Sequence, residues 1–491
     1  MKYLYLLVVF FLASCVSLDE EPASRQVGER FYRNEAEALS AVNAVYESLH
    51  NKDSYLPMSL YNGLIHITTE MATDDYIAGP RARNAHVRAM ASLTYDASNN
   101  RVDELWRETY ITINRANAVV DRTATIPETE ISDGMRSRII NEAKFLRALS
   151  YFNLVRWYGS VPLILHEVND LSSSNLYPAK SSEDSVYVRI VADLEDACQL
   201  PAPSEYAAED AGRATSGAAQ ALLAKVYLTR GRWQQAAETC EKLMSTHWYS
   251  LFPDFSSVFD VAHKNGKEHI FSVQYQGNAG YVGNMLGSLS AAYEVPGING
   301  DYAHAVNPKS GLYAAFVPAD KRRAVTFVTS MVSPADHQSY TLSQPHLFKY
   351  YDPSAEGKPG ESSRNFPVLR YADVLLMYAE ALNEWHGSPT AQAYAALDSV
   401  RARAGLPSLS VSHPSLSQSA FRDSVFLERR KEFVYEHQRW FDLVRRGADY
   451  YVQTLHRAGK SNAAARHIHL PIPQRELDLN PQLKQNPAWA K

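Results

Sequence analysis

The stretch "AAQALLAKVYLTRGRWQQAAETCEKLM" (218–244) decides the fold, because it predicts two antiparallel helices joined by a short turn. Leu223 and Ala224 share one face of the first helix, and Gly231 turns the chain before the second helix begins. Small side chains at Ala224 and Ala236 let the two helices approach closely, while larger neighbours fill the gaps around them. This is the pattern of a tetratricopeptide pair, which repeats at about 34 residues.

A looser copy of the same pattern lies at 371–404. Leu375 and Ala379 mark its first helix, and Ala393 and Leu397 mark its second. Because helical repeats bury their apolar faces only against neighbouring helices, we expect several such pairs to pack together as a scaffold.

Three further helices are predicted in the first third of the chain. Asn34 and Glu37 match a capping box, and apolar residues follow them at helical spacing. The other two helices span Asp103–Arg122 and Asn141–Tyr158. Residues 70–84 lie between the first two helices; they are rich in charges and turn formers, so they predict a loop.

Residues 262–370 break the helical pattern. They hold ten of the chain's 22 glycines, and strand-like pieces such as "HIFSVQY" (269–275) appear. A long irregular segment inside a compact domain is usually functional, so we expect it to form the ligand surface; the alternative is that its aromatic residues form a second small core. The predicted fold class is mainly α: a tetratricopeptide-like scaffold of helical pairs with an insertion of irregular loops and short strands.

The first residues predict a lipoprotein signal. Lys2 precedes the uncharged run Tyr3–Val16, which is shorter than the roughly 20 residues that a membrane span needs. "LASC" (12–15) matches the bacterial lipobox, whose cysteine is acylated as the signal is removed. We therefore expect Cys15 to carry the lipid anchor, and the rest of the chain to be tethered to a membrane without being embedded in it.

Composition and motifs exclude several classes of function. The net charge of −5 gives no reason to expect nucleic acid as a partner. No H-E-x-x-H, G-x-S-x-G or P-loop motif is present, so we predict no catalytic residue and no enzyme. His467 and His469 lack an evident third ligand, so we predict no metal and no cofactor. Cys198 and Cys240 lie in helical patterns and are interpreted as small buried residues, with a disulfide as the alternative that export permits.

Alternating charges recur at helical spacing near the C-terminus. Such spacing allows ion pairs three and four residues apart, and the aromatic residues Trp440 and Phe441 flank the run. We interpret this charged set as structural rather than ligand-binding: Glu428, Arg429, Glu432, Glu436 and Arg439.

Several long blocks of this chain resemble, in the same order, those of SusD/RagB-type outer-membrane lipoproteins of Bacteroidetes. The similarity covers essentially the whole chain after the signal. Its blocks are the lipobox, "EAKFLRALSYFNLVRWYGSVPLI" (142–164), "LRYADVLLMYAEALNE" (369–384), "VRARAGL" (400–406), "ERRKEFVYEHQRWFDLVRRG" (428–447) and "LPIPQRELDLNPQLKQNP" (470–487).

The resemblance implies a tetratricopeptide-containing protein on the outer face of the outer membrane. Asp19, Glu20 and Glu21 then resemble the acidic export signal that directs such lipoproteins to the cell surface, although a solvated tether is the simpler interpretation. Members of the family cap a SusC-like TonB-dependent transporter and deliver a nutrient to it without chemistry. The nutrient is usually a glycan or oligosaccharide; a peptide, as in RagB-type members, is the alternative. A scaffold whose repeats bind only other proteins is a further hypothesis.

These interpretations divide the chain into five parts. They are the signal peptide (1–14), the tether (15–33), the N-terminal helical part (34–261), the irregular ligand-binding insertion (262–370) and the C-terminal part with a further helical pair (371–491).

Candidate ligand-binding residues come from the loop at 70–84 and from the irregular insertion. Tyr and Phe must supply any stacking surface in the insertion, because 262–370 contain no Trp. Arg81 and Arg83 could also pair with the carboxylates of a peptide. The expected ligand-binding residues are Asp74, Asp75, Tyr76, Arg81, Arg83, Tyr275, Tyr281, Tyr293 and Tyr302.

Overall fold

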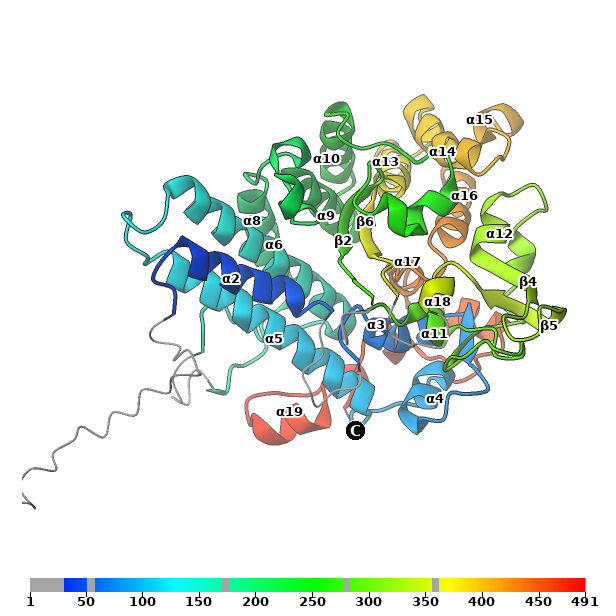
Figure 1. Cartoon of the computed structure of the whole chain (residues 1–491), viewed down its shortest axis with the longest axis horizontal. Helices are drawn as coiled ribbons and strands as arrows, with labels where there is room; N and C mark the ends of the chain where they lie inside the picture. The colour runs from blue at the N-terminus through cyan, green and yellow to red at the C-terminus, as the bar shows by residue number, and fades with distance from the viewer. Residues whose placement is uncertain (1–30, 51–57, 169–175, 278–282, 356–361, 491) are drawn as a thin grey trace, which may run out of the picture.

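The computed structural model describes most of the chain after the predicted tether (Figure 1). The described residues are 31–50, 58–168, 176–277, 283–355 and 362–490. The fold is mainly helical, as predicted. Within these ranges, none of the helices combines the length and the hydropathy that crossing a membrane requires. The lipobox and Cys15 lie outside the described residues.

A continuous row of packed helices forms the scaffold. Each helix packs on the next, from α5 through α6, α8, α9, α10 and α13, with α2 against α5 and α6 at one end and both α14 and α16 against α13 at the other (Figure 1). Their bounds are α2 (Glu35–Glu47), α5 (Asn100–Thr123), α6 (Asp133–Tyr158), α8 (Glu183–Ala197), α9 (Ser216–Thr229), α10 (Trp233–Ser245), α13 (Tyr371–His386), α14 (Ala391–Arg403) and α16 (Gln418–Glu432).

Both predicted tetratricopeptide-like pairs are confirmed. In the first pair, α9 and α10 pack together around Ala224 and Ala236, which are fully buried. Gly231 joins the two helices with φ +66°, a backbone conformation that favours glycine. In the second pair, α13 packs on α14, and α13 also lies against α10, although more than a hundred residues separate them in sequence. The two pairs therefore form one stack, as repeat units require.

The three N-terminal helices are also confirmed, with two of them longer than predicted. The Asn34 side chain caps α2 by accepting a hydrogen bond from the Glu37 amide. The capping box is incomplete, because the Glu37 carboxylate accepts from the amide of Arg33. α5 and α6 begin three and eight residues before the predicted starts, at the caps Asn99 and Ser132.

The irregular insertion contains most of the short strands. Its first and last strands lie side by side, so the insertion begins and ends at the same place in the scaffold. β2 and β6 pair antiparallel, with His269 opposite Arg370, so the two ends of the segment are joined. Two more two-stranded antiparallel sheets pair β1 with β3 and β4 with β5. The elements are β1 (Tyr76–Ala78), β2 (His269–Val273), α11 (Leu286–Leu289), β3 (His304–Val306), α12 (Arg322–Thr326), β4 (Phe327–Val332), β5 (Ser339–Leu347) and β6 (Phe366–Arg370).

The predicted loop at 70–84 is only partly irregular. It contains a short 3₁₀ turn and the strand β1, whose pairing with β3 attaches it to the insertion. The region leads into α4, which packs on β1 and also contacts α5, the first helix of the row (Figure 1). The remaining helices are α3 (Leu64–Thr68), α4 (Ala85–Ser92), α15 (Leu409–Ser412), α17 (Arg439–Arg445), α18 (Ala448–Arg457) and α19 (Gln474–Leu479).

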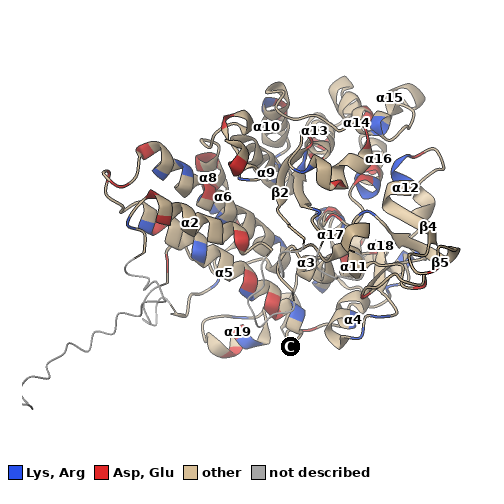
Figure 2. Cartoon of the chain, in the orientation of Figure 1, with Lys and Arg blue, Asp and Glu red and all other residues tan. Residues whose placement is uncertain are grey.

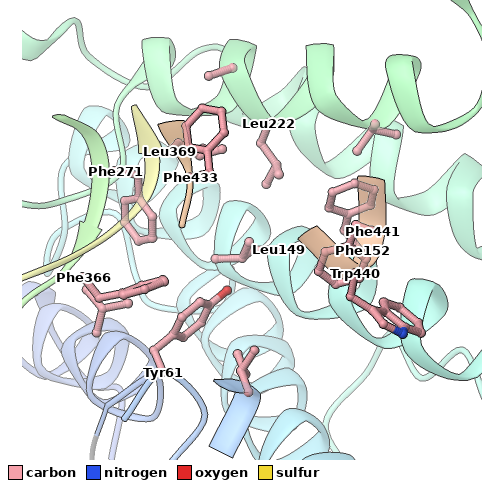
Figure 3. Close-up of a cluster of buried hydrophobic side chains, with 14 of the residues drawn as sticks. Tyr61, Leu149, Phe152, Leu222, Phe271, Phe366, Leu369, Phe433, Trp440 and Phe441 are labelled. Atoms are coloured by element: carbon pink, nitrogen blue, oxygen red, sulfur yellow. The ribbon is translucent and has the colours of Figure 1, made fainter. Parts of the chain in front are cut away.

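One large hydrophobic core joins the scaffold to the insertion. Figure 3 shows side chains from α6, α9, β2, β6 and the C-terminal part meeting in it. Burial of such large apolar side chains contributes roughly 1.5–3 kcal/mol each. A small second core lies under the insertion, formed by Ala291, Ala292, Val295, Ile298 and Leu342. A second core therefore exists, but its buried members are aliphatic, whereas buried aromatic residues of the segment such as Phe271 and Tyr350 belong to the large core.

A buried network of ion pairs ties α16 to the insertion. The charged set is structural, as interpreted, but the arginines that pair with Glu428 and Glu432 come from other elements and not from positions three or four residues away. Glu432 is fully buried and receives hydrogen bonds from Arg322, Arg370 and Arg403. Burial alone would raise the pKa of Glu432, but these three guanidinium groups hold it well below its ordinary value. Figure 2 shows acidic and basic positions side by side around α16.

Cys198, Cys240 and the two C-terminal histidines pack against other residues of the fold. Cys198 and Cys240 are free thiols, and burial raises the pKa of Cys198 to about 11. The His467 ring lies against Tyr95 and Trp489, whereas the His469 ring lies near Gly159. Among the described residues, no group of three His, Cys, Asp or Glu side chains is arranged to hold a metal ion.

Candidate functional site

The first three expected ligand residues lie in the interior. Asp74 accepts hydrogen bonds from Arg439 Nε and Nη2 at 2.9 and 2.8 Å, and Asp75 accepts from Arg430 Nε at 3.1 Å. Burial alone would raise the pKa of Asp74, but the two arginines hold it below its ordinary value. The Tyr76 hydroxyl accepts from a buried backbone amide. These side chains fasten the 70–84 region to the C-terminal part, so we leave them out of the proposed site.

One of the expected tyrosines, Tyr275, also falls outside the candidate site. Tyr275 is 2% exposed, and burial raises its pKa well above the ordinary value. Tyr281 lies outside the described residues. The remaining candidates, Arg81, Arg83, Tyr293 and Tyr302, come from two loops that the fold brings together.

Gly79 sets the distance between these two loops. It follows β1, and its amide donates a hydrogen bond of 2.8 Å to the carbonyl of Ala303. A Cβ atom at position 79 would lie 2.2 Å from the carbonyl oxygen of Tyr302, far inside van der Waals contact. Only glycine permits the two backbones to approach this closely, and this approach places Arg81 beside the second loop.

Four side chains form a stack across the two loops and β5. The Arg81 guanidinium lies over the Tyr293 ring, 5.2 Å from its centroid. Tyr293 stacks on Tyr302 with centroids 4.8 Å apart and an interplanar angle of 27°, and Tyr302 stacks on His346 at 4.4 Å and 20°. Arg81 Nη1 also donates to the carbonyl of Gly300 at 2.7 Å. We call Arg81, Tyr293, Tyr302 and His346 the stack.

Polar side chains of β5 surround the buried half of the stack. Gln344 Nε2 donates to the Tyr302 hydroxyl at 2.7 Å. Glu294 accepts from the Ser343 hydroxyl at 2.7 Å and lies 2.9 Å from His346 Nε2. The stack is thus held at both ends by hydrogen bonds as well as by ring contacts.

The protonation states in the stack follow from burial and these contacts. Burial lowers the pKa of His346, although Glu294 opposes this effect, so the ring is neutral at pH 7. Burial alone would raise the pKa of Glu294, but hydrogen bonds from Ser343 and His346 lower it, so the carboxylate is charged. Burial raises the pKa of Tyr302 to about 12, so its hydroxyl stays protonated.

Tyr302 holds a strained backbone conformation. Its φ of +38° lies in the left-handed region, which is unfavourable for an aromatic residue. Such strain persists only where the surrounding contacts determine the conformation, and it is concentrated at functional sites. The stacking on both sides of Tyr302 provides such contacts, and they turn its carbonyl toward Gly79.

The sequence predicted only the loop half of this site. His346, Glu294, Ser343 and Gln344 were missed, because they lie on or against β5 and match no motif. One available signal was the turn-rich run "YEVPGINGDY" (293–302), which places Glu294 directly after a candidate tyrosine. Nothing in the sequence places β5 beside that run.

A separate hollow of about 630 Å³ lies between α5 and α19. Its walls are mostly carbon, from residues such as Ile111, Pro162 and Leu479. Trp106 lies at its wall but is only 3% exposed, so it presents little of its ring face. Polar side chains such as Arg107, Asn114 and Glu476 also line it, but none of the expected ligand residues does. Three of those residues meet at the stack, and we therefore place the candidate site there.

The fold and the candidate site together define a class: a helical-repeat protein whose insertion and 70–84 region together form a candidate surface site. Two family models match the chain. One is described as the SusD family and matches residues 271–489; the other is described as "Starch-binding associating with outer membrane" and matches residues 18–228. The chain belongs to the SusD-like family.

Relatives match over most of their length. SusD-like protein P2 of Formosa agariphila is 29% identical over 519 residues, which is 99% of this chain and 98% of the relative. A SusD-like protein of Bacteroides ovatus is 27% identical and covers 89% of this chain and 80% of its own length.

Solved structures share the fold. A laminarin-binding SusD-like protein superposes with a TM-score of 0.77 at 28% identity, covering 93% of this chain and all of its own. A SusD homolog from Bacteroides thetaiotaomicron gives a TM-score of 0.78 at 24% identity, covering 94% of this chain and 98% of its own.

Proposed function

We propose that this chain is a cell-surface lipoprotein that captures an oligosaccharide and passes it to a SusC-like TonB-dependent transporter, with no chemistry of its own. The observation that carries the proposal is the stack, in which three separate segments converge on a rigid scaffold with one end exposed to solvent. Binding sites are commonly built on loops that a scaffold holds in place. The laminarin-binding relative in the same family supports a carbohydrate as ligand.

The exposed end of the stack suits a polar ligand. The Arg81 guanidinium has donors beyond the one that it gives to the Gly300 carbonyl, and the hydroxyl oxygens of a sugar can accept such hydrogen bonds. The site is built from the loop after β1, the loop at 293–302 and the strand β5.

Binding of oligosaccharides tests the proposal. Calorimetric titration of the chain without its signal, against a panel of oligosaccharides that includes laminarin fragments and against oligopeptides, measures the ligand class. Saturable binding of an oligosaccharide supports the proposal. Binding of oligopeptides alone would replace it with the peptide-importer hypothesis.

Replacing Gly79 by alanine is expected to lower the affinity for the bound oligosaccharide about tenfold or more. The new Cβ meets the Tyr302 carbonyl at 2.2 Å, so the two loops must separate, and a site tolerates displacements of only about 0.5 Å. The measurement is titration of both proteins with the same oligosaccharide. Gly134→Ala is the matched control, since no atom lies within 4 Å of a Cβ added there. Equal affinities for wild type and Gly79→Ala would remove the stack from the proposed site.

Replacing Cys15 by alanine is expected to release the protein from the membrane without unfolding it. The residue lies outside the described part of the chain, and acylation of its thiol is the proposed anchor. Fractionation of cells into membrane and soluble material, followed by the circular dichroism of the released protein, measures both effects. A variant that stays in the membrane fraction would show that another part of the chain holds it there.

A further inference from the structure

The solvent-facing end of the stack is a guanidinium group and not an aromatic face. Both faces of the Tyr302 ring are in stacking contact, one with Tyr293 and one with His346, and the residue is 2% exposed. Tyr293 is half-buried and carries Arg81 over its ring. Arg81 itself is exposed. A ligand that reaches the stack from solvent therefore meets a cation first.

Arg81 has hydrogen-bond donors to spare. Its Nη1 donates to the Gly300 carbonyl, while its Nε and Nη2 have no partner among the described residues. Within the same part of the chain, no carboxylate lies within 4.0 Å of it, whereas the partly buried Arg430 and Arg439 are paired with Asp75 and Asp74. The two remaining donors, Nε and Nη2, lie on the same edge of the guanidinium group, so together they can bind two oxygens of one oxyanion.

The loop that carries Arg81 adds further positive charge. Arg83 is exposed and has no ion pair among the described residues. Arg88 stabilises the loop, since its Nη1 donates to the carbonyls of Ala82 and Arg83 at 2.9 and 2.8 Å. The loop therefore holds two exposed cationic side chains in a set geometry.

The nearby carboxylates do not neutralise this end of the stack. Glu294 is held by Ser343 and His346 on the β5 side. Asp301 follows Gly300 and is exposed, but it forms no ion pair with Arg81 in the part of the chain that the structure describes. An anionic ligand group would complete the coordination of Arg81 without displacing an existing pair.

We infer that the site selects oligosaccharides that carry anionic groups, as uronate carboxylates or sulfate esters, and that Arg81 binds the anion. This inference rests on the proposed function. A guanidinium binds an oxyanion through two parallel charge-assisted hydrogen bonds, which are about twice as strong as those to a neutral hydroxyl. Arg83 lies two residues away and adds electrostatic attraction for a ligand with repeated anionic groups.

The experiment uses matched pairs of oligosaccharides on the chain without its signal. An array presents uronate oligosaccharides beside their carboxyl-reduced forms, and sulfated oligosaccharides beside their desulfated forms; calorimetry then measures each pair that binds. The anionic member is expected to bind at least about tenfold more tightly, and raising the salt concentration to 0.5 M is expected to reduce that preference. The two kinds of pair distinguish carboxylate from sulfate as the recognised group.

Two variants separate the charge of Arg81 from its structural role. Arg81→Gln is expected to weaken binding of the anionic member about tenfold and of the neutral member far less, and Arg81→Lys to retain part of the preference. Arg232→Gln is the matched control, because Arg232 is exposed on the first helical pair and has no side-chain cap bond or ion pair among the described residues. Equal losses for both members would show that Arg81 only holds the Gly300 loop, and would overturn the inference.

The possible outcomes distinguish this inference from the proposed function. Tight binding of neutral oligosaccharides, with no gain from an anionic group, overturns the inference and leaves the proposed function standing. Failure to bind any oligosaccharide overturns both. Binding of acidic peptides alone also overturns both and favours the peptide-importer hypothesis.

Discussion

Replacing Glu432 by glutamine is expected to lower the free energy of unfolding by about 3–5 kcal/mol. Glu432 is the central acceptor of the buried network: Arg370 Nη1 lies 2.5 Å from Oε1, Arg322 Nη1 lies 2.9 Å from Oε2, and Arg403 also donates to Oε1. Neutralising this carboxylate leaves three buried guanidinium groups with too little negative charge. Because most domains are stable by only about 5–15 kcal/mol, this loss is large.

Urea unfolding at pH 7, followed by circular dichroism, measures this effect. Glu128→Gln is the matched control, since the Glu128 residue is exposed and has no ion pair among the described residues, and a surface change of this kind stays within about 0.5 kcal/mol. A Glu432→Gln variant as stable as the control would mean that water or a relaxed network satisfies the arginines.

Acid is expected to unfold this protein, with three buried histidines responsible for much of the loss. Burial lowers the pKa of His66 and of His304 to about 3, and of His437 well below the ordinary value. All three are neutral in the folded state, whereas the unfolded chain protonates histidine near pH 6.5. Their stabilising contribution is therefore complete above pH 6.5 and is lost as the pH falls toward 3. By pH 4.5 His66 and His304 each cost on the order of 3 kcal/mol.

Glu70 acts in the opposite direction beside these rings. Burial raises its pKa to about 8, so the folded state prefers the protonated carboxyl. The unfolded chain ionises glutamate near pH 4.3, so stability contributed by Glu70 is complete below that value and is lost as the pH rises toward 8. One glutamate offsets only part of the effect of three histidines, and the net result is a loss of stability on acidification.

Replacing His66 by phenylalanine isolates one of these histidines. The ring stays aromatic beside Phe366, which it meets edge to face at 5.2 Å, but it no longer titrates. Relative to wild type, the variant is expected to gain about 3 kcal/mol on moving from pH 7.5 to pH 4.5. Urea unfolding at both pH values measures this difference, with His166→Gln as the control because the His166 side chain is 85% exposed. An unchanged difference between the two pH values would assign the acid sensitivity to other groups.

The helices could be predicted from sequence because their signals are local. Helical spacing, the caps at Asn34 and Gly231 and the small residues at Ala224 and Ala236 act within a few residues of one another. The spacing of the charges at α16 predicted ion pairs three and four residues apart, whereas Glu432 pairs with arginines from other elements. Its partner Arg370 could not be assigned, because it lies on a strand 62 residues away from Glu432.

The same reasoning misplaced Asp74 and Asp75 among the exposed loop residues. A charged, turn-rich stretch usually lies at the surface, and nothing near it in sequence signals a buried partner. Their partner Arg439 lies 365 residues from Asp74. The pairing makes burial of the carboxylates possible, and it exists only once the C-terminal part has folded against β1.

By itself the sequence determined the helical-repeat scaffold and the segment that interrupts it, because both are patterns of neighbouring residues. Only the tertiary structure decided the site. Arg81 reaches a carbonyl 219 residues away, Tyr302 stacks on a ring from β5, and Gly79 permits the contact by having no side chain. Such contacts depend on how loops pass one another in space. No sequence pattern indicates that geometry. Only the folded structure shows that a guanidinium group, and not a tyrosine ring, faces the solvent.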